Sequence, residues 1–313
     1  MKGLDLALSF FKEYGEPMLS AQFPEVSKYI AVGLVGSGSE CYGYDDEISR
    51  DHDFEPAFCI FIPDEDIINR KVEFELERAY AKLPKEYCGF KRAPLNPVGG
   101  NRHGVIRMGD FYAAKTGSRD GQLSVYDWFN IPEHSLLEAT NGEVFLDNYG
   151  LFTGIREKLS YYPDDIRLKK IAGNLLLMGQ SGQYNYNRLI LRNDTAAAQL
   201  AVTEFVKSAM NVVFLLNRRY MPYYKWSFCA LRKLPFLSQL SLDFEFLISS
   251  GNDDELAKQK SETIENVCQK IAAELDAQGI ARKTTTEMEQ LAYAVNDKIT
   301  DNEIRNLNIL YGV

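Results

Sequence analysis

The N-terminal half of the chain alternates short apolar runs with segments of helical periodicity. Apolar residues recur at helical spacing over 3–14, and a second short helix is predicted over 16–23. Residues 29–35 run apolar into a Gly-Ser turn, and residues 54–62 form a second apolar run, both typical of buried strands. The other predicted elements are strands over 103–108 and 143–146 and helices over 64–81, 110–117, 123–129 and 132–139.

From Leu151 onward the pattern predicts helices almost without interruption. The predicted helices cover 151–161, 163–192, 194–220, 225–233, 254–278 and parts of 284–310. Predicted N-caps are Asp64, Asp110, Asp194, Thr286 and Asp301. The sequence therefore predicts an α+β protein, with an α/β domain and small mixed sheet over 1–150 and an all-helical domain over 151–313.

Composition narrows the class of protein without identifying it. The 313 residues are 45% hydrophobic and 25% charged, as in ordinary globular proteins. The net charge of −9 argues against general binding to nucleic acid or anionic membranes. Five scattered cysteines without a C-x-x-C pair indicate free thiols in a reducing compartment. The N-terminus lacks the pattern of a signal peptide and no run reaches the ~18 apolar residues of a membrane span. We therefore expect a cytoplasmic protein.

Candidate chemistry gathers between the first two predicted strands. Gly36-Ser37 ends the first strand, and Ser49, Asp51 and Asp53 lie where the second is expected to begin. Alternate residues of a strand share a face, so the two aspartates would point the same way. Paired carboxylates repel unless a cation lies between them, and hard oxygen ligands beside phosphate favour Mg²⁺.

This arrangement resembles the signature of the nucleotidyltransferase superfamily, which has the polymerase-β-like fold. The signature is a Gly-Ser turn followed by Asp-x-Asp, here Asp51-His52-Asp53. The longer run GSGSE-x-x-G-x-DDE-x-S-x-DHD resembles more narrowly the bacterial domain-of-unknown-function family 4037. That family is grouped with the nucleotidyltransferases and is related in layout to kanamycin and lincosamide nucleotidyltransferases. The resemblance extends to about Leu240.

The resemblance implies roles for these residues. Gly36 and Ser37 would hold the triphosphate, and Asp51 and Asp53 would bind Mg²⁺. Ser49 is expected to hydrogen-bond the turn, orient Asp51 and contribute to the nucleotide site. The implied reaction transfers AMP from ATP to a hydroxyl group of a small molecule, such as an aminoglycoside-like compound. Analogy with the kanamycin-type enzymes adds the expectation of a homodimer.

A third carboxylate, or another general base, has no single candidate. The strand over 103–108 carries no acid. A strand–Asp–Gly pattern in the kanamycin-type relatives favours Asp147, and Asp110 and Glu143 are alternatives. His103 is a further possible base, although a lone histidine beside a strand is more often structural. Without such a group the protein would bind a nucleotide and not turn it over.

The helical domain supplies cations that could meet a triphosphate. Arg219 and Lys225 lie in an Arg-, Lys- and aromatic-rich run after an apolar helix. They are interpreted either as a phosphate clamp or as cations that complement the helix dipole. Lys170 is interpreted either as part of a nucleotide wall or as a member of an interhelical hydrogen-bond network.

The loop between the strands is acidic and has two interpretations. Its acids either bind a cationic acceptor or help to hold the metal, or they form an ordinary solvated loop. These acids are Glu40, Asp45, Asp46 and Glu47. Transfer of the nucleotide onto RNA is disfavoured, because the chain is acidic and has no broad stripe of Lys and Arg.

Overall fold

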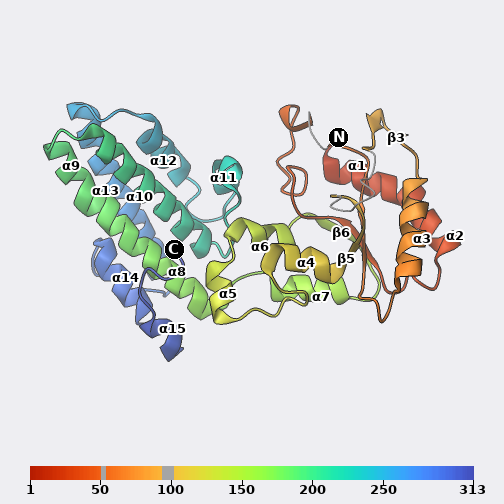
Figure 1. Cartoon of the computed structure of the whole chain (residues 1–313). Coiled ribbons are helices and arrows are strands. Elements are labelled where there is room, and N and C mark those ends of the chain that lie inside the picture. The colour runs from red at the N-terminus through yellow and green to blue at the C-terminus, as the bar shows by residue number, and fades with distance from the viewer. Residues whose placement is uncertain (51–53, 94–101) are drawn as a thin grey trace. The chain divides into compact units, whose positions relative to one another are not determined.

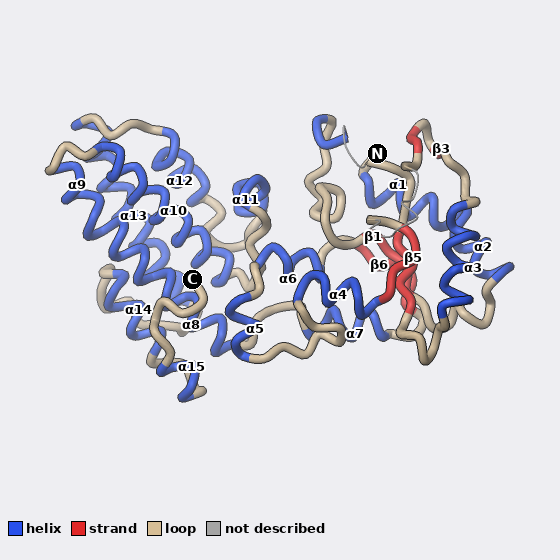
Figure 2. The backbone as a smooth tube through the Cα atoms, viewed as in Figure 1, coloured by secondary structure: helices blue, strands red, loops and turns tan. Residues whose placement is uncertain are grey.

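The computed structural model describes the whole chain except residues 51–53 and 94–101 (Figure 1). The contacts between residues divide the chain into two compact units. Unit 1 consists of Met1–Leu123 and Ile131–Ser160, and unit 2 consists of Ser124–Asn130 and Tyr161–Val313. Every described strand belongs to unit 1, while unit 2 is helical (Figure 2). The α+β class predicted from the sequence is confirmed.

Unit 1 is built on a four-stranded mixed sheet with the order β5-β2-β1-β6. The strands are β1 (Ala31–Leu34), β2 (Cys59–Ile62), β5 (Gly104–Arg107) and β6 (Glu143–Asp147). Strand β1 runs antiparallel to β2 and β6, and β2 runs parallel to β5. The end of β1 and the starts of the other three strands therefore meet at one edge of the sheet, which we call the turn edge.

The second strand begins later than the sequence predicts. It was expected to start at Phe54, but β2 begins at Cys59, and the described residues before it are not in a strand. Pro56 has no N–H to give to a ladder. The backbone N–H of Phe58 donates to the hydroxyl of Tyr80 at 3.2 Å, not to a neighbouring strand. Asp51 and Asp53 lie outside the described part of the chain, so the geometry expected of them stays a prediction.

Helices cover this sheet, and their apolar faces form the core of unit 1. Phe10, Phe58, Ile60, Leu76 and Tyr80 are fully buried in it. Its helices are α1 (Gly3–Phe10), a π-helical turn (Phe11–Gly15), α2 (Glu16–Gln22), a 3₁₀ turn (Ile48–Arg50), α3 (Arg70–Ala81), α4 (Met108–Thr116), α6 (Glu133–Thr140) and α7 (Leu151–Lys158). A short hairpin joins β3 (Glu86–Tyr87) to β4 (Phe90–Lys91).

Two of the predicted caps in unit 1 are wrong. Helix α3 begins six residues after Asp64 and is capped by Asn69, whose side chain accepts from two backbone N–H groups. Asp110 lies in the first turn of α4, and Arg107 precedes that helix. In both cases an acid near the start of a helix is favourable to the dipole without being the cap.

Unit 2 is a bundle in which α8 packs against both α10 and α14. Its elements are α5 (Val125–Asn130), α8 (Asp164–Met178), a π-helical segment (Gly179–Tyr186), α9 (Asn187–Leu191), α10 (Thr195–Leu216), α11 (Tyr224–Leu231), α12 (Leu240–Ser249), α13 (Asp254–Ala277), α14 (Met288–Asn296) and α15 (Asn302–Asn306). The caps at Asp194 and Asp301 are confirmed. Thr286 is not a cap, because α14 begins after Glu287, and α12 was not predicted.

Helix α10 is the longest apolar element of unit 2. Within the described residues it is the one helix whose length and hydropathy would allow it to cross a membrane. In its most apolar window, 61% of the residues are buried inside the protein. Packing against α8, α12 and α13 accounts for this apolar composition.

Candidate functional site

The Gly36–Ser37 turn lies at the turn edge and is held there by Asn141. The backbone N–H of Gly36 donates to Asn141 Oδ1 at 2.8 Å, and Asn141 Nδ2 donates to the Gly36 carbonyl at 2.8 Å. Gly36 has φ of +104°, a value that favours glycine. Asn141 is 9% exposed. This reciprocal pair of hydrogen bonds fixes the turn to Asn141, which lies two residues before β6.

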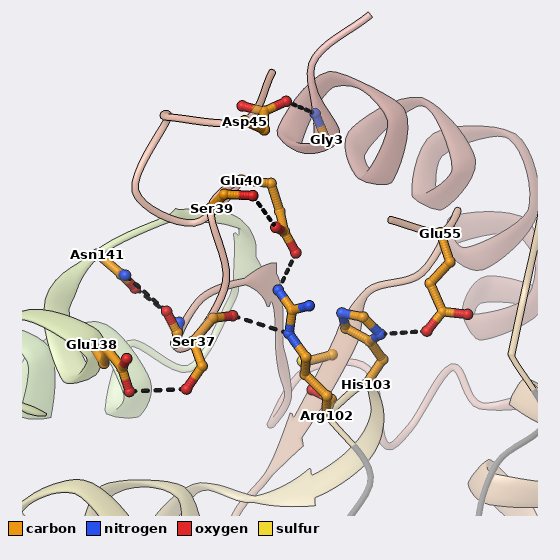
Figure 3. A network of polar contacts seen from close by, with 12 residues as sticks. Gly3, Ser37, Ser39, Glu40, Asp45, Glu55, Arg102, His103, Glu138 and Asn141 are labelled. Carbon is orange, nitrogen blue, oxygen red and sulfur yellow. Dashed lines mark hydrogen bonds and ion pairs between the residues drawn. The ribbon is translucent and has the colours of Figure 1, made fainter. Parts of the chain in front are cut away.

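The hydroxyl of Ser37 belongs to a polar cluster of Ser37, Tyr42, Lys115 and Glu138, which we call the Ser37 cluster. Figure 3 shows its contact between Ser37 and Glu138. Ser37 Oγ donates to Glu138 Oε2 at 2.9 Å and lies 3.0 Å from the ammonium of Lys115. Lys115 also forms an ion pair with Glu138, and Tyr42 Oη donates to Glu138 Oε1 at 3.0 Å. Burial opposes ionisation of Glu138, but the bonds from Lys115, Ser37 and Tyr42 outweigh it and lower the pKa of this carboxyl.

A second ion pair holds the backbone on the other side of Ser37. Arg102 Nε donates to the Ser37 carbonyl at 2.9 Å, and its guanidinium pairs with Glu40 (Figure 3). Glu40 is 6% exposed. Burial of Arg102 disfavours its charge, but the neighbouring Glu40 carboxylate raises the pKa of the guanidinium overall. Both sides of the turn therefore carry a cation paired with a glutamate.

A pocket of about 390 Å³ opens beside the turn within unit 1. Gly36, Ser37 and Lys115 line it together with the ring of Phe111 and the guanidinium of Arg102. The lining side chains also include Glu73, Glu77, Arg107 and Asp110. The pocket combines polar donors with apolar wall, as small-molecule sites do.

His103 and Glu55 form a buried pair at the same edge of the sheet. His103 Nδ1 lies 2.8 Å from Glu55 Oε1, and His103 is 5% exposed. Burial opposes ionisation of Glu55, but the contacts with His103 and the Ala93 backbone N–H lower its pKa overall. The carboxylate thus orients the ring immediately before β5 (Figure 3).

The acidic loop that follows the turn is only partly solvated. Asp45 is 3% exposed and accepts the backbone N–H of Gly3 at 2.9 Å, so it anchors the start of α1. Glu40 is committed to Arg102. Asp46 and Glu47 are exposed. Two of the four acids are therefore structural, and two remain accessible to solvent.

The predictions for the metal ligands Asp51 and Asp53 and for Ser49 of the loop have different outcomes. Asp51 and Asp53 lie outside the described residues, so their pairing stays a prediction. Ser49 lies in the 3₁₀ turn, where its Oγ accepts from the Asp46 N–H at 2.7 Å. Among the residues that the structure does describe, no group of three His, Cys, Asp or Glu side chains could hold a metal ion.

Asp147 is not brought to the Gly36–Ser37 turn. It pairs with Ala31 at the start of β1, three residues or roughly 10 Å from Leu34 at the turn edge. Its carboxylate accepts from the N–H groups of Gly150 and Thr153 at 2.9 and 2.8 Å. This placement fits a capping role at the start of α7. Glu143 pairs with Leu34 and so lies at the turn edge, with an exposed side chain.

The predicted residues of the helical part lie in unit 2. Lys170 is 5% exposed, and its ammonium donates to the carbonyl of Gly312 at 2.8 Å. Arg219 is exposed after the end of α10, and Lys225 is exposed with its ammonium 5.1 Å from the Trp226 ring centroid. Lys170 is therefore engaged in the packing of the unit, whereas the other two face solvent.

Sequence reasoning missed three residues that shape the turn. Asn141 precedes Gly142 in an Asn-Gly dipeptide, a turn signal that could have pointed to it. Lys115 and Glu138 carry no such signal, because they are 78 and 101 residues from Ser37 and come from different helices.

Comparison with known proteins adds one result to this geometry. Residues 128–227 match the family model described as "Domain of unknown function (DUF4037)", which supports the resemblance to that family. The matched range contains Glu138, Asn141 and Asp147 of unit 1 and Lys170 and Arg219 of unit 2. The chain matches no curated protein.

Proposed function

We propose that the chain is a Mg²⁺-dependent nucleotidyltransferase that transfers AMP from ATP to a hydroxyl group of a small molecule. The observation that carries the proposal is the Gly36–Ser37 turn, fixed beside Lys115 and Arg102 on a pocket of about 390 Å³. A turn that lacks a Cβ at Gly36 lets phosphate approach the backbone closely. An ammonium and a hydroxyl supply donors to its oxygens.

The described residues fit a triphosphate better than they fit a metal ion. Ser37, Lys115 and Arg102 provide donors around one pocket, whose volume is in the range of small-ligand sites. The Mg²⁺ ligands would be Asp51 and Asp53, as the sequence predicts, since the chain after them enters β2 at the turn edge. When bound, Mg²⁺ would neutralise charge on the phosphate oxygens during transfer.

The reaction also requires a group that accepts a proton. The acceptor oxygen forms a bond to the α-phosphorus, the bond to the pyrophosphate oxygen breaks, and the hydroxyl proton must go to a base. Of the sequence candidates, His103 and Glu143 lie at the turn edge, Asp110 lines the pocket beside Ser37, and Asp147 lies at the opposite end of β1. We therefore take His103, Glu143 and Asp110 as the candidate bases. The exposed acids of the adjoining loop suit a cationic acceptor such as an aminoglycoside-like compound.

A nucleotide-binding protein without turnover is the second candidate. This second candidate is favoured by the ion pairs beside Ser37, since the carboxylates of Glu40 and Glu138 are each paired with a cation. An acid held in this way is a poor base. The two candidates share the nucleotide site and differ in the chemistry that follows.

Thermal unfolding tests the shared site. Mg–ATP at about 100 times its Kd should stabilise the protein by about 2.7 kcal/mol, a rise in Tm of several degrees. The double substitution Asp51→Ala with Asp53→Ala should abolish the rise. Glu47→Ala, which removes an exposed acid from the same loop, should leave it intact. Absence of any rise in the wild type would exclude both candidates.

Pyrophosphate release separates the two candidates. The wild type with Mg–ATP should release pyrophosphate in the presence of at least one member of a panel of hydroxylated amines and sugars. A protein that binds Mg–ATP and releases none with any acceptor would be a nucleotide sensor.

A further inference from the structure

Glu138 occupies an unfavourable position for a carboxylate. It lies in the last turn of α6, where the unpaired carbonyl groups carry a partial negative charge. Its side chain is 16% exposed, so solvent screens that repulsion only in part. A carboxylate in such a place needs compensating donors, and the protein supplies them from elsewhere in unit 1.

Three donors from three separate segments converge on this one carboxylate. Ser37 comes from the turn after β1, Tyr42 from the loop that follows, and Lys115 from the last turn of α4. The ammonium of Lys115 is also 3.0 Å from Ser37 Oγ, so the donors form one group. Two hydroxyls and an ammonium around a single anion are equally suited to phosphate oxygens.

Two of these donors also face the pocket. Ser37 and Lys115 line it, so a ligand bound there can reach the donors that Glu138 now occupies. A phosphate group and the carboxylate would compete for them because both are anions that need the same hydrogen atoms.

We infer that Ser37 and Lys115 form the subsite for a phosphate group of the nucleotide, and that Glu138 occupies these two donors in the ligand-free protein. The inference rests on the proposed function and names further binding residues for it. Binding of the triphosphate transfers Lys115 and Ser37 from the carboxylate to phosphate oxygens. Glu138 therefore opposes binding, which is the reverse of what a positioning residue for Lys115 would do.

Isothermal titration of the full chain with Mg–ATP tests the inference through the sign of the change. Glu138→Gln keeps the shape of the side chain and removes the competing charge, so Kd should fall about fivefold. Lys115→Gln should raise Kd about tenfold. Mg–tripolyphosphate should show the same order of affinities, because the subsite contacts phosphate only.

A matched control removes one negative charge without touching the cluster. Glu75 is exposed on α3, and Glu75→Gln should leave Kd unchanged. Melting curves without ligand identify any variant that fails to fold, and Glu138→Ala then replaces Glu138→Gln.

The outcomes separate the inference from the proposed function. A wild type that binds Mg–ATP, with binding in Glu138→Gln equal or weaker, would overturn the inference and leave the proposed function standing. Absence of binding in both the wild type and Glu138→Gln would overturn the proposed function as well. Tighter binding in Glu138→Gln than in the wild type, with Glu75→Gln unchanged, would support both the inference and the proposed function.

Discussion

At the scale of single residues, the conformation of the Gly36–Ser37 turn depends on one buried amide. Asn141 uses both ends of its side chain on Gly36, at 2.8 Å each. Asn141→Ala leaves the N–H and carbonyl of Gly36 without these partners, so it should destabilise unit 1 by about 1–3 kcal/mol. Urea unfolding measures this change. Asn141→Asp keeps the acceptor for the Gly36 N–H but sets a buried carboxylate oxygen against the Gly36 carbonyl, so it should destabilise unit 1 at least as much as the alanine variant.

The charge of Glu138 makes the stability of unit 1 depend on pH. The pKa of this carboxyl is lower in the folded protein than in the unfolded chain, where it is near 4.3. Its contribution to stability is therefore complete above the unfolded pKa and is lost as pH falls through the folded pKa. Glu138→Gln should flatten, but not remove, the decline in stability between about pH 5 and pH 3.

Urea unfolding at a series of pH values measures this slope. The lowered pKa of Glu55 keeps part of the decline in the variant. Glu75→Gln should have the slope of the wild type, since its exposed carboxylate lies outside the cluster. An unchanged slope in Glu138→Gln would contradict the assigned hydrogen bonds.

The sequence allowed the turn residues to be predicted, but not the residues around them. Gly36 and Ser37 stand in a local motif between two apolar runs, so their role can be inferred from neighbours in the chain. Lys115 and Glu138 come from helices whose packing is decided by the whole core. Asp147 was misjudged because a local pattern could not show which end of β1 it would face.

At the scale of elements, the corner between α6 and β6 holds the site together. Helix α6 carries Glu138, Asn141 follows it, and Gly142 then turns the chain into β6 with φ of +65°. A Cβ at Gly142 would overlap the carbonyl oxygen of Leu34 in β1. The corner is therefore packed directly against the strand that leads to the turn.

Two glycines of unit 1 provide a matched test of this packing. Gly142→Ala should lower the free energy of unfolding by about 1–2 kcal/mol because of the positive φ. The overlap with the Leu34 carbonyl should lower it by about 1–3 kcal/mol more. Gly117 has φ of +77° and open space around its Cβ position. Gly117→Ala should therefore lower the free energy of unfolding only by the part that comes from the positive φ. Chemical unfolding of both variants measures the difference, and equal losses would contradict the close approach at Leu34.

Element boundaries were predictable from local signals only in part. Asp194 and Asp301 cap helices as expected, but Asp64, Asp110 and Thr286 carry the same kind of local signal and do not cap. The predicted helix over 163–192 is instead interrupted by the π-helical segment Gly179–Tyr186. There a Cβ at Gly182 would meet the ring of Phe205 in α10, so tertiary packing sets the backbone.

At the scale of the whole molecule, the order of the units does not follow the order of the chain. Residues Ser124–Asn130, which contain α5, lie in sequence between two segments of unit 1 and pack in unit 2. Trp128 meets the ring of Tyr162 with centroids 5.8 Å apart, and Phe129 meets Tyr311 at 5.3 Å. The hydrophobic periodicity of the sequence does not show that α5 packs in unit 2, because its pattern is that of any short amphipathic helix.

Trp128→Ala should therefore destabilise unit 2, although Trp128 lies between segments of unit 1 in the sequence. Trp128 is 7% exposed, and loss of a buried tryptophan side chain costs about 3–5 kcal/mol. Hydrogen exchange followed by mass spectrometry should show faster exchange in α8 and the other helices of unit 2. Strands β1 and β2 of unit 1 should keep their protection. The reverse distribution would contradict the assignment of α5 to unit 2.

The placement of α5 also constrains how the protein is made. The ribosome releases α5 before any of its partners in unit 2, and Phe129 meets Tyr311 only roughly 180 residues later. At about 5–20 residues per second, roughly 10–40 s of synthesis pass between them. Throughout that interval the nascent chain holds Phe129 without this partner and exposes it to chaperones. Unit 1 can close around its sheet in the meantime, with Phe129 left outside until Tyr311 has been synthesised.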